Sequence, residues 1–180
     1  MNKKKKITLA LITISIVIVV SIPLIYFCFK TNSSNPENAE SFNIDSELLS
    51  KSVNVLTDEQ KIKISRYFIV KELSLFKEDT DVSDKVAKEI FTNSYKDVGK
   101  HKLRRNIETD RFTDLEFNFS DEKLSNFSDE DFTYSGNVII FGHNLNNNDE
   151  KTSMNLDYIL NIVNENGVLK INKLTKNIIK

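Results

Sequence analysis

An acidic stretch near the middle of the chain is the first place where residue types and spacing suggest metal chemistry. Asp79, Asp81 and Ser83 alternate as the first ligands of a calcium-binding loop do. Such a loop needs glycine at its sixth position and glutamate at its twelfth, where this sequence has Asp84 and Ile90. Acidic residues in a turn also cap the helix that follows them. We therefore interpret the stretch as a capping turn and predict no metal site.

Histidine and cysteine are the next candidate ligands. His101 follows Gly99 among several lysines, where positive charge suits the end of a helix, and His143 lies in a polar stretch typical of an exposed loop. The single cysteine, Cys28, lies in an apolar segment, so it can neither form a disulfide bond within the chain nor complete a cysteine-based zinc site. We predict that neither histidine binds a metal.

The sequence lacks the short motifs on which common catalytic and nucleotide-binding sites are built. It has no G-x-S-x-G turn for a serine nucleophile, no phosphate-binding loop and no dinucleotide fingerprint. Only four glycines are available for such turns. We therefore predict that the domain is not an enzyme and that it binds no cofactor.

An uncharged apolar segment near the N-terminus indicates attachment to a membrane. Residues 7–29 contain no charged side chain, and a helix of 23 residues can span a hydrocarbon core of about 30 Å. Lysines occupy positions 3–6, so residues 1–6 should stay in the cytoplasm and the chain after the span should be exported. We predict a single-pass helix in contact with the lipid of the cell membrane. A cleaved signal peptide and lipidation at Cys28 are the alternatives.

The predicted exported part is acidic. Residues 31–180 carry 20 basic and 26 acidic side chains, a net charge of −6. Such a domain repels phosphate backbones, so we predict no nucleic-acid partner. Residues 30–52 are mostly polar and include a turn-forming proline, which is typical of a linker. We assign residues 30–52 to a linker and residues 53–180 to one domain.

Two helices are predicted at the start of this domain. Thr57 and Gln60 match a capping box, and apolar residues at helical spacing follow them. A second helix is expected to begin at residue 83 or 84 and to end at Gly99, a typical C-cap residue.

From about residue 103 onward the apolar period changes from helical to two, which predicts strands. We interpret Gly136 as a β-bulge, and Asn166-Gly167 between two alternating runs predicts a hairpin. Alternation on one face is typical of an antiparallel sheet that rests on a core, so we predict an α+β fold with helices packed on about four strands. The predicted core residues are Phe68, Leu73, Phe91, Leu156, Leu160 and Ile171.

The last predicted hairpin carries the most specific pattern in the chain. In residues 158–171 an alternating run meets a turn that ends in glycine and then returns, and the run 132–141 fits the strand before it. These segments resemble exported bacterial members of the nuclear transport factor 2-like (cystatin-like) superfamily, with Leu169 at a position where tryptophan is usual. The resemblance implies a curved sheet wrapped around the first long helix and a cone-shaped pocket. Candidate acid–base residues for such a pocket are Tyr67, Asp97, Asp110 and Glu116.

Within this superfamily, membrane-anchored scaffold subunits of type IV secretion and conjugation machines share the layout of a short cytoplasmic tail, one span and an exported domain. The resemblance therefore implies an assembly subunit of a cell-envelope complex, with other envelope proteins as partners and an undetermined oligomeric state. The alternative is a membrane-tethered protein whose pocket binds a small apolar ligand or an envelope component. An assembly subunit predicts a filled interior and an exposed apolar patch, whereas the alternative predicts a large apolar cavity between helix and sheet.

Overall fold

The computed structural model of the chain describes residues 36–77, 80–109, 112–144 and 150–179. The chain divides into two units, Met1–Asn35 and Pro36–Lys180, and the described residues all belong to the second. The predicted tail over residues 1–6 and the predicted transmembrane helix over residues 7–29 lie outside the described residues. None of the helices that the structure describes is long and apolar enough to cross a membrane.

The second unit is built on one antiparallel sheet whose strands follow each other in chain order. The strands are β1 (Glu37–Asn38), β2 (Phe112–Ser125), β3 (Asp131–Asn144), β4 (Glu150–Glu165) and β5 (Val168–Ile178). The α+β fold is thus confirmed, and the described sheet has five strands where about four were expected. The additional strand, β1, comes from the segment assigned to a linker, and it pairs Glu37 with Phe117 of β2.

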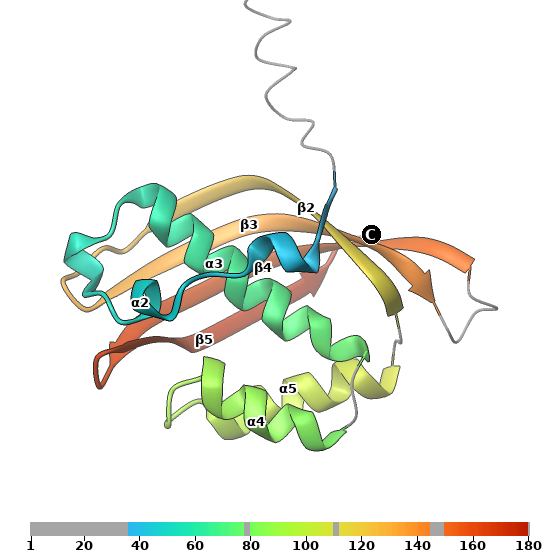
Figure 1. Ribbon diagram of the computed structural model, residues 1–180, viewed down its shortest axis with the longest axis horizontal. Helices are drawn as coiled ribbons and strands as arrows, with labels where there is room; N and C mark the ends of the chain where they lie inside the picture. Colours follow the sequence, from blue (N-terminus) through green and yellow to red (C-terminus); the bar gives the residue numbers. More distant parts are fainter. Residues whose placement is uncertain (1–35, 78–79, 110–111, 145–149, 180) are drawn as a thin grey trace, which may run out of the picture. The chain divides into compact units, whose positions relative to one another are not determined.

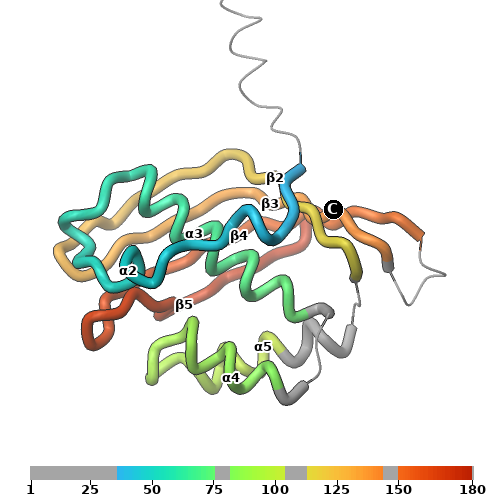
Figure 2. Tube along the Cα trace, viewed as in Figure 1, coloured from blue at the N-terminus to red at the C-terminus, as the bar shows by residue number. Residues whose placement is uncertain are grey.

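Helical segments cover one face of this sheet. They are η1 (Ala39–Phe42), α2 (Ser46–Leu49), η2 (Val53–Val55), α3 (Asp58–Leu73), η3 (Ser74–Lys77), α4 (Thr80–Ile90) and α5 (Lys96–Thr109). Figure 1 shows α3 lying across the sheet, with α4 and α5 next to each other near β5. The trace in Figure 2 shows the same layering and the long β4–β5 hairpin.

The first long helix begins where its cap was predicted. The Thr57 hydroxyl oxygen accepts a hydrogen bond from the backbone N–H of Gln60 at 3.2 Å, and the Gln60 side chain accepts one from the backbone N–H of Thr57 at 3.1 Å. This reciprocal pair satisfies two donors that a helix start would otherwise leave free. The helix then buries Ile64, Phe68 and Leu73 against the sheet.

The predicted second helix is wrong in its bounds, because the chain forms two helices where one was expected. The backbone N–H of Thr92 donates to the carbonyl oxygen of Ile171 in β5 at 3.0 Å, so the chain leaves the helical path after Ile90. Gly99 lies inside α5 and does not end a helix. A Cβ atom there would lie 2.4 Å from the Phe91 ring, so glycine permits close packing of α5 on that ring.

The sheet is irregular in β2 and regular at Gly136, so the predicted β-bulge at Gly136 is wrong. The register of β2 shifts twice, and Asp114 and Asp121 have positive φ values of 52° and 54° near these shifts. The β3–β4 pairing runs without interruption through Gly136 and Tyr158, so Gly136 is not a bulge. A Cβ atom on Gly136 would lie 2.7 Å from the Tyr134 hydroxyl oxygen, and glycine therefore leaves room for that side chain.

The hairpin and the core are confirmed. Asn166 and Gly167 form the two-residue turn with φ values of 56° and 81°, the left-handed region that this dipeptide favours. An additional aromatic side chain, Phe42 of η1, packs against Phe117 and Phe119 with ring centroids 5.9 and 5.3 Å away. All six predicted core residues are buried: Phe68, Leu73, Phe91, Leu156, Leu160 and Ile171.

Candidate functional site

The structure does not bring the predicted acid–base residues together. Tyr67 is half-buried on α3, Asp97 is exposed on α5, and Glu116 of β2 lies 3.7 Å from Lys151 at the surface of the sheet. Asp110 lies outside the described residues. The three that are described therefore belong to three separate surfaces and do not form one site.

The candidate metal ligands are likewise separated. His101 is exposed within α5, and His143 is half-buried in β3 opposite Lys151 of β4. Asp79 lies outside the described residues, and Asp81 and Ser83 belong to helix α4. Among the residues that the structure describes, no three His, Cys, Asp or Glu side chains are placed to hold a metal ion.

A buried group that we call the interior cluster joins α3 to β4 and β5. Glu72 is 1% exposed, and its carboxylate accepts hydrogen bonds from the Tyr158 hydroxyl at 2.6 Å and from the Lys176 ammonium at 2.9 Å. Burial first, and then the charge of Glu72 and its hydrogen bond, raise the pKa of Tyr158, so the hydroxyl remains a donor. The sequence contained one sign of this cluster: Glu72 occupies a core-facing position of the helix, four residues after Phe68.

A second, half-buried group fastens α3 to the sheet. Arg66 donates from Nε to Glu122 Oε1 at 2.9 Å and pairs with the other carboxylate oxygen, and the Tyr134 hydroxyl donates to Oε1 at 2.8 Å. The guanidinium also lies over the Phe119 ring, 5.2 Å from its centroid. Burial and the neighbouring carboxylate of Glu122 raise the pKa of Tyr134. Arg66 and Tyr134 thus donate to the same carboxylate, and this arrangement holds α3 against β2 and β3.

The space between α3 and the sheet is filled by side chains that are almost fully buried. Phe68 and Ile64 of α3 belong to the same buried cluster as Phe132, Tyr134 and Tyr158 of the sheet, and each is at most 1% exposed. The centre of the domain, as far as the structure describes it, is therefore filled by side chains.

A pocket does lie elsewhere, between η1, α3 and α4, and we call it the α3–α4 pocket. Its volume is about 350 Å³. The Tyr67 hydroxyl donates to Glu89 Oε1 at 3.0 Å, and Lys71 Nζ lies 3.4 Å from the same oxygen. Burial first, and then the hydrogen bond to Glu89, raise the pKa of Tyr67 to about 12. Sequence reasoning singled out Tyr67 but assigned it to a different cavity.

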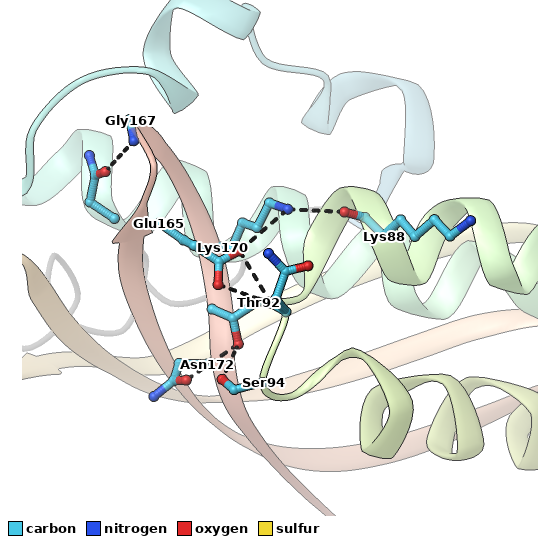
Figure 3. A network of polar contacts seen from close by, with 9 residues as sticks. Lys88, Thr92, Ser94, Glu165, Gly167, Lys170 and Asn172 are labelled. Carbon is cyan, nitrogen blue, oxygen red and sulfur yellow. Dashed lines mark hydrogen bonds and ion pairs between the residues drawn. The ribbon is translucent and has the colours of Figure 1, made fainter.

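Polar contacts fix the turn between α4 and α5 to the β4–β5 hairpin (Figure 3). Glu165 accepts a hydrogen bond from the backbone N–H of Asn93 at 2.9 Å and lies 3.7 Å from Lys170. Lys170 also donates to the carbonyl oxygen of Lys88 at 3.1 Å, and Thr92 contacts Asn172 at 3.3 Å. These bonds hold the chain where the two helices separate, so we assign this network a structural role.

The opposite side of the sheet, which we call the outer sheet face, has a different character. Figure 1 shows the helices gathered on the other side. Ile159 is 43% exposed there, and Asn155 has a buried side-chain oxygen with no hydrogen-bond partner in the described residues. The outward side chains at the centre of this face include Asn137, Ile139, Phe141, Asn155, Asp157, Ile159 and Val163. Of these seven side chains, Asp157 alone is charged, and Ile139, Phe141, Ile159 and Val163 are apolar.

Helices packed on one face of a curved antiparallel sheet define a fold of the nuclear transport factor 2-like type. No protein-family model matches the chain, and no curated protein matches its sequence. The structure is similar to that of a putative calcium/calmodulin dependent protein kinase II association domain from Xanthomonas campestris. The two are 9% identical, the match covers 69% of this chain and 89% of the other, and the TM-score is 0.51.

Two further solved structures are similar at lower scores. An IcmL-like type IV secretion system protein from Legionella pneumophila is 13% identical over 69% of this chain and 95% of its own, with a TM-score of 0.47. A putative scytalone dehydratase from Novosphingobium aromaticivorans is 12% identical over 69% of this chain and 89% of its own, with a TM-score of 0.47. At these identities the likeness shows the fold alone.

The prediction that the domain is not an enzyme is wrong. Solved structures of similar fold include enzymes, among them dehydrochlorinases and the putative scytalone dehydratase, and this fold often carries catalytic activity. The prediction relied on the absence of short motifs, but a site assembled from separate helices and strands needs no such motif. The interior cluster illustrates the point, because Glu72 and Tyr158 are 86 residues apart in the chain.

Proposed function

We propose that this chain is a membrane-anchored assembly subunit of a cell-envelope complex, with residues 36–180 on the outer side of the cell membrane. The outer sheet face is the observation that carries this proposal. Ile139, Phe141 and Ile159 lie there among polar side chains that include Asp157, and no described helix covers them. An uncovered surface that groups apolar side chains with polar ones around them is typical of protein–protein contacts.

The N-terminal sequence supports the anchored part of the proposal. The uncharged residues 7–29 follow lysines at positions 3–6, the pattern of a span whose N-terminus stays in the cytoplasm. Confinement to a thin layer beside the membrane raises the effective concentration of the domain for other anchored proteins, so modest contacts through the outer sheet face suffice. Conjugation-type secretion channels are the specific candidate, because their scaffold subunits share this layout.

Site-specific crosslinking in living cells tests the proposal. A photo-crosslinking amino acid replaces Ile159 on the outer sheet face, and in a matched control it replaces Val98 on α5, which is 51% exposed. We expect products of higher mass from position 159 and none from position 98. If position 159 yields only monomer, under conditions that capture known envelope complexes, the assembly proposal is wrong.

A further inference from the structure

The α3–α4 pocket presents an apolar floor with charged side chains at its rim. The floor is contributed by Phe42 of η1, Val70 of α3, Leu75 of η3 and Val86 of α4. Phe42, Val70, Leu75 and Val86 are all buried in the fold, so their positions are fixed by core packing. A volume of about 350 Å³ lies at the lower end of the range for small-molecule sites, which run from roughly 300 to 1,000 Å³.

Two of the four charges at the rim are engaged with each other and two are not. Glu89 already receives the Tyr67 hydroxyl and the Lys71 ammonium. The side chains of Lys85 and Glu40 are exposed, and neither makes a hydrogen bond or an ion pair with another residue in the part of the chain that the structure describes.

The two unengaged charges stand on different walls of the pocket. Lys85 belongs to α4 and Glu40 belongs to η1, and Figure 1 shows α3 between these two elements. The pocket therefore offers one free cation and one free anion around an apolar floor, and the sum of its rim charges is zero.

We propose that the α3–α4 pocket binds a small zwitterion with an apolar side chain, namely an apolar amino acid or a short apolar peptide with free ends. The ligand carboxylate pairs with Lys85, its ammonium pairs with Glu40, and its side chain rests on Phe42, Val70 and Val86. This site lies outside the filled interior and away from the outer sheet face, so the proposal is independent of the assembly function.

Other ligand classes fit these charges less well. An anionic amphiphile such as a fatty acid would place a second negative charge beside Glu40 and leave Glu40 without a cationic partner. A cationic amphiphile would place a second positive charge beside Lys85 and leave Lys85 without an anionic partner. A nucleotide or sugar phosphate requires several cations in convergence, and here Lys71 is already paired with Glu89.

Ligand-observed NMR titration of the full chain in lipid nanodiscs tests the proposal with defined probes. Leucyl-leucine supplies both charges and apolar side chains, its N-acetylated form lacks the ammonium, and its C-terminal amide lacks the carboxylate. We expect leucyl-leucine to bind about two- to fivefold more tightly than either blocked form, because each blocked form loses one solvent-exposed ion pair with the pocket. Glycyl-glycine, which has no apolar side chain, should bind at least about tenfold more weakly.

Substitutions assign each charge to its partner. Lys85→Gln should lower the affinity for leucyl-leucine to that of the C-terminal amide, and it should leave the affinity for the amide unchanged. Glu40→Gln should lower the affinity for leucyl-leucine to that of the N-acetylated form, and it should leave the affinity for the N-acetylated form unchanged. Lys88→Gln is the matched control, because Lys88 is exposed on the same helix and does not line the pocket. The proposal is overturned if leucyl-leucine does not bind, if decanoate binds more tightly, or if Lys85→Gln and Lys88→Gln behave alike.

Discussion

Replacing Tyr158 with phenylalanine removes one hydroxyl from the interior cluster and keeps the ring. The hydroxyl donates to the buried carboxylate of Glu72 at 2.6 Å, and Tyr158 has no exposed surface. A hydrogen bond to a charged acceptor contributes about 1.5–3 kcal/mol, so Tyr158→Phe should lower the free energy of unfolding by that amount. Glu72 keeps its bond to Lys176, which limits the loss.

Tyr95→Phe is the matched control for this prediction. The Tyr95 hydroxyl donates to the carbonyl oxygen of Leu174 at 3.1 Å, in a half-buried site with a neutral acceptor, so its loss should cost only about 0.5–1.5 kcal/mol. Urea unfolding of the full chain, followed by circular dichroism, measures both variants against the wild type. Equal losses for the two variants, or a loss below about 0.5 kcal/mol for Tyr158→Phe, would show that the charge of Glu72 does not strengthen this bond.

Three other predictions concern the core, the pH dependence and the topology. Leu160→Ala should lower the free energy of unfolding by about 2–5 kcal/mol, and a change below about 0.5 kcal/mol would contradict its burial. The pKa of Tyr67 rises from 10.0 to about 12 on folding, so its contribution to stability is complete below pH 10 and is lost as pH rises toward 12. Over that interval the wild type should lose more stability than Tyr67→Phe, and equal losses would refute the shift. A reporter active only in the cytoplasm and fused after Lys180 should be inactive, whereas strong activity would refute export.

Local signals in the sequence predicted the elements whose causes are themselves local. The Thr57–Gln60 cap and the Asn166–Gly167 turn depend on residues three and one positions apart, and both have the expected geometry. Alternating apolar residues likewise placed Leu156 and Leu160 on the inner face of β4. The sequence did not predict the break after Ile90, the regular pairing at Gly136 or the pairing of β1 with β2. All three depend on contacts with distant residues that no local pattern contains.

For the candidate sites, too, the sequence predicted what depends on neighbouring residues and missed what depends on distant ones. Apolar periodicity and the order of elements were enough for an α+β fold, and the resemblance carried by residues 132–141 and 158–171 indicated the nuclear transport factor 2-like type. That resemblance also made Tyr67 a candidate for acid–base chemistry. The sequence could not show that Tyr67 joins Glu89 at the surface, because the two residues are 22 positions apart on different helices.

Tertiary structure alone decided which polar groups are buried together and which charges remain unengaged. Glu72 and Lys176 are 104 residues apart, and they meet because α3 crosses the inner face of β4 and β5. The same packing leaves Lys85 and Glu40 on different walls of one pocket. Periodicity determines which face of an element is apolar, whereas the partner of each side chain depends on how the elements cross, and that geometry exists only in the folded chain.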